Sequence, residues 1–174
     1  SQRRFLDGIF ITKPGAFKKM SAQKIMVYTD GSSRGNPGPG GFGAILEFGS
    51  KRMELSQGFR RTTNNRMELL AVIVALEHIK NKNYTVVIHS DSKYVIDSIT
   101  KGWVFGWVKK GFKDKKNPDL WQRYLSLHPN FKLEFVWVKG HAGHPQNERC
   151  DELAVQAATQ APKNIDAWFE ANPN

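Results

Sequence analysis

Five short segments of the chain carry the apolar pattern that is typical of β-strands. Residues 24–30 (KIMVYTD) and 85–91 (TVVIHSD) are almost continuously apolar, which indicates strands that are buried on both faces. Residues 41–49 and 51–59 are separated by a short turn, as the two strands of an antiparallel hairpin are. Residues 132–140 (KLEFVWVKG) form the last predicted strand.

Four further segments have helical patterns, and they are residues 62–80, 92–101, 118–128 and 148–161. Thr and Asn residues can cap the first of these helices, and Pro118 opens the third at a position where helices tolerate proline. Residues 102–117 (GWVFGWVKKGFKDKKN) are aromatic and basic, and we expect them to be irregular. Strands that come first as a meander and then alternate with helices predict an α/β fold. We expect a five-stranded mixed sheet in which the first three strands along the chain are antiparallel, with helices on its faces.

The length of 174 residues fits one domain with a substantial core. We expect an N-terminal basic arm of unknown role over residues 1–23, the domain over residues 24–161 and a C-terminal tail over residues 162–174. No apolar run approaches the roughly 18 residues that a membrane helix needs. The single cysteine, Cys150, excludes an internal disulfide and a four-cysteine metal site. A reducing compartment fits this composition, so we expect a cytoplasmic monomer without membrane contact.

The charge of the chain is strongly basic and unevenly distributed. Lys and Arg number 26 against 16 Asp and Glu, which gives a net charge of +10. Residues 101–123 contain seven basic and two acidic residues, and residues 1–24 contain six basic and one acidic. The rest of the chain is therefore close to neutral. Such basic segments indicate nucleic acid or another anionic surface as a partner, although they also occur as solvated faces.

Four acidic residues occupy positions where acids are unexpected, at the ends of buried strands or on otherwise apolar helix faces: Asp30, Glu68, Asp91 and Asp151. Their helical neighbours in line are apolar, namely Val72, Ala75 and Ile79 for Glu68, and Ala154, Val155 and Ala158 for Asp151. Each acid alone could cap a helix or a turn. Adjacent first and fourth strands, with two helix starts pointing inward, would instead bring all four carboxylates to one end of the sheet.

A carboxylate cluster of this kind repels itself, so it must raise its pKa values or bind cations. Oxygen ligands without a set of histidines and cysteines select Mg²⁺ or Mn²⁺ over zinc. Two such ions about 3.5–4 Å apart form the arrangement that cleaves phosphodiesters. An acidic, metal-binding site surrounded by basic surface indicates a nuclease.

Four blocks of the sequence resemble type 1 ribonuclease H, especially its bacterial members. The blocks are TDGSSRGNPGPGG (29–41), TTNNRMELLAVIVAL (62–76), SDSKYV (90–95) and WVKGHAGHPQNERCDELA (137–154), in the order of that family. The resemblance covers residues 24–161, which it identifies as the catalytic domain with a ribonuclease H-like fold. Residues 1–23 match nothing in the catalytic core of the family.

The resemblance implies an endonuclease that hydrolyses the RNA strand of RNA–DNA hybrids and leaves 3′-hydroxyl and 5′-phosphate ends. It implies two Mg²⁺ ions per site with substrate bound, with Mn²⁺ as a substitute, held by Asp30, Glu68, Asp91 and Asp151. His141 matches a histidine that assists proton transfer or product release. We expect little sequence specificity, because a hybrid can be recognised by its 2′-hydroxyls and its deformability.

The resemblance also implies a set of residues that contact the hybrid: Gly31, Asn36, Thr63, Asn64, Asn65, Lys93, Trp103, Lys109, Lys110 and Lys113. Asn36 and Thr63 match a phosphate site for the DNA strand, and residues 101–117 resemble the basic protrusion that grips this strand. Lys93 departs from the family, in which glutamine is more frequent, so its contact could shift from ribose or base to phosphate. Trp107 fits packing at the root of the protrusion better than substrate contact.

Other interpretations fit the sequence less well. A zinc site of His141, His144 and Cys150 lacks a fourth ligand, and the glycine-rich stretch 29–41 is not a P-loop because no Gly-Lys-Ser/Thr follows it. Transposases, integrases and junction resolvases share the predicted fold but carry a different carboxylate set. A hybrid-binding module without catalysis would not need four acids.

Overall fold

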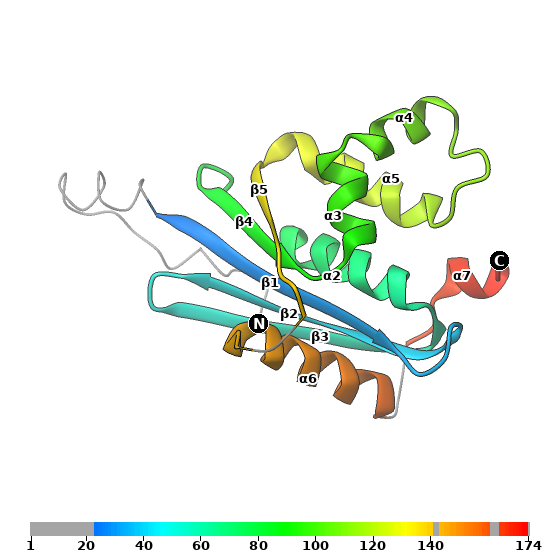
Figure 1. The fold of residues 1–174 in the computed structure, drawn as a ribbon, viewed down its shortest axis with the longest axis horizontal. Coiled ribbons are helices and arrows are strands. Elements are labelled where there is room, and N and C mark those ends of the chain that lie inside the picture. The colour runs from blue at the N-terminus through cyan, green and yellow to red at the C-terminus, as the bar shows by residue number, and fades with distance from the viewer. Residues whose placement is uncertain (1–22, 141–142, 161–163, 174) are drawn as a thin grey trace.

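A five-stranded sheet forms the centre of the computed structural model, which describes residues 23–140, 143–160 and 164–173 (Figure 1). The strands are β1 (Lys24–Ser33), β2 (Gly38–Phe48), β3 (Lys51–Thr62), β4 (Thr85–Ser90) and β5 (Lys132–Trp137). Their order across the sheet is β3-β2-β1-β4-β5. The pairs β1–β2 and β2–β3 are antiparallel, whereas β4 pairs parallel with both β1 and β5. The predicted mixed α/β sheet is therefore confirmed.

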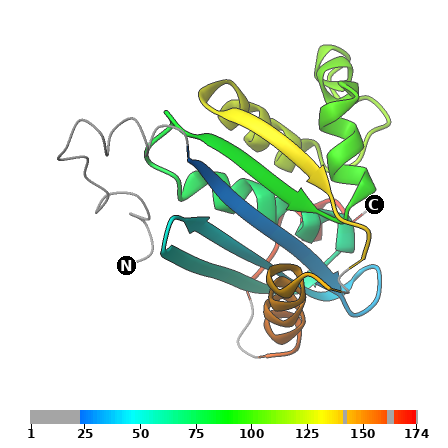
Figure 2. The same ribbon diagram turned by 60° about the vertical axis from the view of Figure 1, so that its left-hand side comes forward.

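Helices cover both faces of this sheet, as Figure 2 shows. Their bounds are α2 (Asn64–Glu77), α3 (Lys93–Thr100), α4 (Trp103–Lys109), α5 (Pro118–Leu127), the 3₁₀ helix η2 (His128–Asn130), α6 (Pro145–Thr159) and α7 (Ala167–Ala171). Helix α2 lies on one face beneath α3 and α5, and α6 lies on the other. None of the helices in the described part of the chain is long and apolar enough to cross a membrane.

Helix α2 forms the centre of the main hydrophobic core. Its residues 66–76 are all buried, because the sheet covers one side of the helix and α5 packs on another. The side chain of Thr63 caps the helix by accepting a hydrogen bond from the amide of Arg66. The burial of α2 from residue 66 onward sets the position of Glu68 in its second turn.

Helix α4 corrects the prediction that residues 102–117 are irregular. Residues 103–109 form a short helix between two glycines with positive φ, Gly102 and Gly111. Gly106 inside the segment, and Lys109 and Lys110 at its end, obscure the helical period in the sequence. Burial of Val104 against the core stabilises a helix that local preference alone did not indicate.

Three glycines allow α6 to pack directly on the backbone of the sheet. A Cβ atom at Gly41 would lie 2.7 Å from the carbonyl oxygen of Ala154, and Cβ atoms at Gly43 and Gly58 would collide with carbonyl oxygens of the same helix. Gly43 pairs with Asp30 across the β1–β2 ladder, so α6 crosses the sheet beside Asp30. Helix α6 also begins at Pro145, three residues before the predicted start, with proline in its first turn.

The C-terminal segment 164–173 packs back on β3 and α2. The backbone of Asn164 forms two hydrogen bonds with β3. Its carbonyl oxygen accepts from the amide of Arg60 at 2.9 Å, and its amide donates to the carbonyl oxygen of Gly58 at 2.8 Å. Helix α7 follows and buries Phe169. This part of the predicted C-terminal tail therefore lies on the domain, next to the start of α2 (Figure 1).

Candidate metal-binding active site

Three carboxylates meet at the end of the parallel strands β1 and β4. Asp30 lies in β1, Asp91 directly follows β4, and Tyr28 pairs with His89 in the parallel ladder, so both acids extend past the same point of the sheet. Glu68 reaches them from the second turn of α2. One oxygen of each acid lies within 4.8 Å of the others, and we call Asp30, Glu68 and Asp91 the carboxylate cluster. The sequence predicted this meeting of the three acids.

Gly31 allows α2 to come close enough for Glu68 to join the cluster. A Cβ atom at Gly31 would lie 2.6 Å from the carbonyl carbon of Met67, a distance that real side chains do not adopt. The amide of Gly31 donates to Oε1 of Glu68, and it also lies 2.9 Å from Oδ1 of Asp30. Gly31 was predicted to contact the hybrid; its amide is engaged with two carboxylates of the cluster.

The electrostatics of the cluster favour a bound cation. Asp30 and Glu68 are each 4% exposed, and Asp91 is half-buried. Burial raises the pKa of Glu68 well above its ordinary range, and the charges of Asp30 and Asp91 raise it further, while the Gly31 hydrogen bond opposes this shift. A hard divalent cation relieves the repulsion, and an all-oxygen donor set fits Mg²⁺ or Mn²⁺.

Asp151 lies on α6 and is not one of the three members of the carboxylate cluster. The neighbouring Cys150 anchors this turn of α6, because its thiol lies 3.3 Å from the carbonyl of Tyr28 on β1. Asp151 itself is half-buried, and Ala154 and Ala158 on its face are buried as predicted. Val155 is exposed, contrary to the prediction, because the face that meets the glycine row is too narrow to include it.

Among the described residues, neither His144 nor Cys150 belongs to a group of three potential metal ligands. Burial raises the pKa of the Cys150 thiol, which is fully enclosed by the packing of α6 on the sheet. His144 is exposed just before α6. His141, the predicted assisting histidine, lies outside the described residues.

The two predicted phosphate contacts, Asn36 and Thr63, line a common cleft of about 360 Å³. Asn65, a predicted ribose contact, lines it as well. The Asn36 side chain is fixed because its Oδ1 accepts a hydrogen bond of 2.9 Å from the amide of Asn64. The cleft is also lined by residues that sequence reasoning did not single out: Lys115, Lys116, Asn117, Trp168 and Asn172. Trp168 and Asn172 gave no signal in the sequence because they belong to the segment predicted as a tail.

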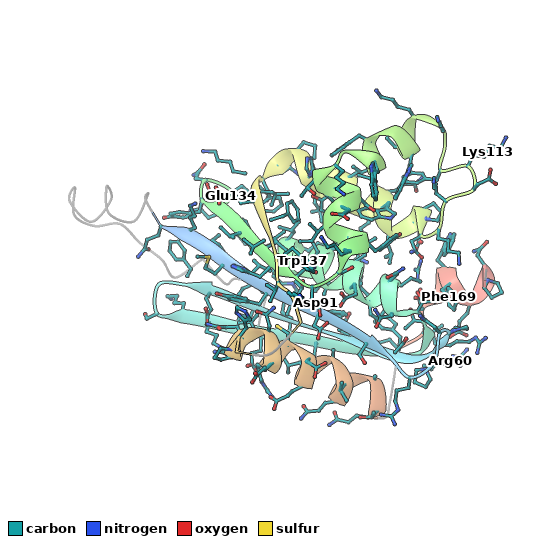
Figure 3. The ribbon with its side chains drawn as sticks, viewed as in Figure 1. Arg60, Asp91, Lys113, Glu134, Trp137 and Phe169 are labelled. Atoms are coloured by element: carbon teal, nitrogen blue, oxygen red, sulfur yellow. The ribbon has the colours of Figure 1, made fainter. Side chains whose placement is uncertain are left out.

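The basic protrusion consists of α4 and the loop that follows it. Trp103 is 47% exposed, and Lys109, Lys110 and Lys113 are exposed, with Lys113 far from the sheet in Figure 3. Trp107 instead packs edge-on against the buried Trp121, with ring centroids 6.1 Å apart, which agrees with the expected role at the root of the protrusion.

Trp137 at the end of β5 is a neighbour of the cluster that sequence reasoning missed. Its indole nitrogen lies 3.3 Å from the carbonyl oxygen of Asp91, and the ammonium of Lys93 lies 4.0 Å from its ring centroid. Figure 3 shows Trp137 directly beside Asp91. The signal was present, because Trp137 opens the fourth block of the resemblance.

Comparisons with known proteins agree with this geometry. The RNase H family model matches residues 22–159. A ribonuclease H from Rippkaea orientalis (strain PCC 8801 / RF-1) is 49% identical over 155 residues, which cover 86% of this chain and 94% of that protein.

Two solved structures are also similar to the chain. LC9-RNase H1, described as a type 1 RNase H with the type 2 active-site motif, has a TM-score of 0.70 at 36% identity, covering 86% of this chain and 80% of that one. LC11-RNase H1, solved in complex with an RNA/DNA hybrid, has a TM-score of 0.56 at 28% identity, covering 78% of this chain and 96% of that one. Because the family model and the bacterial relative both span most of the sequence, the chain belongs to the ribonuclease H family of nucleases.

Proposed function

We propose that this protein hydrolyses the RNA strand of RNA–DNA hybrids at the carboxylate cluster, and that Asp151 completes the metal site. The observation that carries the proposal is the approach of three carboxylate oxygens to within 4.8 Å of one another at a buried sheet end. Two Mg²⁺ ions, or Mn²⁺ in their place, would supply an activated water and charge neutralisation at the leaving oxygen, which yields 3′-hydroxyl and 5′-phosphate ends.

Each protein group has a separate task in this proposal. The strand ends orient Asp30 and Asp91, and the Gly31 amide orients Glu68 toward them. Asp151 is more accessible than Asp30 and Glu68, which suits a ligand that adjusts when substrate arrives. His141 is proposed to assist proton transfer or product release.

The hybrid is proposed to lie across the cluster, between the cleft and the protrusion. The cleft that Asn36 and Thr63 share with Lys115 and Lys116 suits a phosphate of the DNA strand, because residues with side-chain amides, a hydroxyl and two lysines line it. Asn64 and Asn65 lie at the start of α2, where they are proposed to contact the hybrid near its ribose hydroxyls. Lys93 lies at the start of α3, where it is proposed to contact a phosphate of the hybrid instead. Trp103, Lys109, Lys110 and Lys113 are proposed to grip the DNA strand. Contacts to backbone and sugar carry little sequence information.

The test is cleavage of a labelled RNA–DNA hybrid with Mg²⁺, with and without a chelator, beside RNA and DNA duplexes. We expect cleavage of the RNA strand of the hybrid only, and its loss with chelator and in Asp30→Asn. Glu152→Gln is the matched control, because Glu152 lies next to Asp151 on the exposed face of α6. Equal cleavage by Asp30→Asn and the unchanged protein would overturn the proposal.

A further inference from the structure

Lys93, Trp137 and Asp91 form a connected unit at the rim of the carboxylate cluster. Lys93 is the first residue of α3, and Trp137 is the last residue of β5. Trp137 pairs with Ser90 in the parallel β4–β5 ladder, and the amide of Val138 lies 2.9 Å from the carbonyl oxygen of Ser90. Lys93 therefore follows Asp91 by two residues, and Trp137 lies on the strand that pairs with the residue before Asp91.

Trp137 is held in place although it is not a core residue. It is 42% exposed, which is unusual for so large an apolar side chain. Its indole nitrogen, 3.3 Å from the carbonyl oxygen of Asp91, fixes the plane of the ring. The Lys93 ammonium lies over this ring at 4.0 Å from the centroid, within the range of a cation–π contact.

This contact restrains a side chain that otherwise has great conformational freedom. A lysine on the first turn of a short helix samples many rotamers, and a flexible cation contributes little to binding because it must be ordered first. The Lys93 ammonium stacks on the Trp137 ring, and this ring is hydrogen-bonded to the backbone of Asp91. The two contacts together set the position of the ammonium relative to the carboxylate cluster. Lys93 lies two residues after Asp91, a predicted metal ligand. Under the proposed function its cation would therefore lie beside the RNA strand rather than at the protrusion.

We propose that Trp137 is a positioning residue that holds the Lys93 ammonium for contact with a phosphate of the RNA strand next to the scissile one. This inference rests on the proposed function and names one contact within it. Trp137 acts through Lys93 and has no part in the chemical step. Removal of either side chain then weakens hybrid binding through loss of the same phosphate contact. The losses in affinity from the two substitutions are therefore not additive.

The experiment combines Lys93→Gln, Trp137→Leu and the double variant. KM and kcat are measured on a labelled hybrid with Mg²⁺ at several salt concentrations, after thermal unfolding has shown that each variant folds. Each single variant should raise KM roughly three- to fivefold with little change in kcat, as expected for one exposed charge contact. In both single variants the slope of log(kcat/KM) against log(salt concentration) should become shallower by the amount expected for about one lost phosphate contact. The double variant should be no worse than either single one.

Two further variants separate positioning from structure. Trp137→Phe keeps an aromatic face and should retain most of the affinity, as should Lys93→Arg. Lys82→Gln is the matched control, because Lys82 stacks on Phe131 at 5.5 Å near the opposite ends of β4 and β5 and should leave the salt dependence unchanged.

Binding of a fluorescent hybrid to the same variants, each carrying Asp30→Asn so that substrate stays intact, gives Kd without cleavage. Lack of cleavage by the unchanged protein contradicts the proposed function. Multiplicative effects of the two substitutions, a loss in kcat instead of KM, or an unchanged salt dependence of Kd contradicts the role of Trp137.

Discussion

Arg66 of α2 and Asp166 of the C-terminal segment form a buried ion pair, with 2.7 Å between Nε of the arginine and Oδ2 of the aspartate. Arg66 is 1% exposed and also pairs with Asp119 at the start of α5, at 2.7 Å. Burial lowers the pKa of Arg66, but hydrogen bonds to the two aspartates raise it above its ordinary value overall. One side chain thus joins α2, α5 and the C-terminal segment, two residues before Glu68.

Asp166→Ala should lower the free energy of unfolding by about 3 kcal/mol, because it leaves a buried arginine with one carboxylate partner fewer. Urea denaturation measures this change. Glu170→Ala is the control: it removes the carboxylate that pairs with the exposed Arg60 in the same segment, and it should have a much smaller effect. Equal losses from the two substitutions would contradict a special role for the buried pair.

Gly31→Ala should destabilise the fold by about 1–3 kcal/mol and reduce kcat, because the new methyl group pushes the start of α2, and with it Glu68, away from Asp30. Denaturation and hybrid cleavage measure the two effects. Gly106→Ala in α4 is the matched control, since a Cβ atom there meets open space and alanine favours a helix. If the Gly31 variant is as stable and active as the original, the close approach does not control the site.

The raised pKa of Glu68 predicts how the metal-free protein responds to pH. The unfolded chain loses this proton near the ordinary value of 4.5, whereas the folded chain keeps it to higher pH. The folded state therefore binds more protons in that window, and stability falls as pH rises through it. Urea denaturation with chelator between about pH 4 and about pH 8 should show this decline, and Glu68→Gln should reduce it. A decline of the same size in the variant would assign it to other groups.

Mg²⁺ should stabilise the fold, because the proposed metal site exists only in the folded chain. At 100 times its Kd the gain is about 2.7 kcal/mol, measured as a rise in the unfolding temperature. Asp91→Asn should abolish most of the rise, and Glu152→Gln on the exposed face of α6 should preserve it. An unchanged rise in the Asp91 variant would place the bound ion elsewhere.

The strands and helices that carry the cluster followed from local patterns in the sequence. The apolar runs that end at Asp30 and Asp91 predicted buried strands, and the parallel β1–β4 pair brings their ends together. Glu68 was recognisable because it interrupts an apolar helical face. These inferences succeeded because strand burial and helical periodicity depend on residues close together in the chain.

Helix α4 and Val155 show where local patterns failed. The period of residues 103–109 is hidden by Gly106 and the lysines, and the helix depends on burial of Val104. Val155 has the character of a buried residue but faces solvent, because the row of glycines under α6 admits only a narrow face of that helix.

The sequence by itself determined the order of strands and helices, the position of three acids at one end of the sheet, and the basic character of residues 101–123. Only the tertiary structure decided that the C-terminal segment lines the cleft beside Thr63. It also decided that Lys93 stacks on Trp137, whose indole nitrogen lies beside the carbonyl oxygen of Asp91. The physical reason is separation along the chain. Arg66 and Asp166 are 100 residues apart, and Asp91 and Trp137 are 46 apart, so their contacts arise from the packing of whole elements and leave no periodic signal.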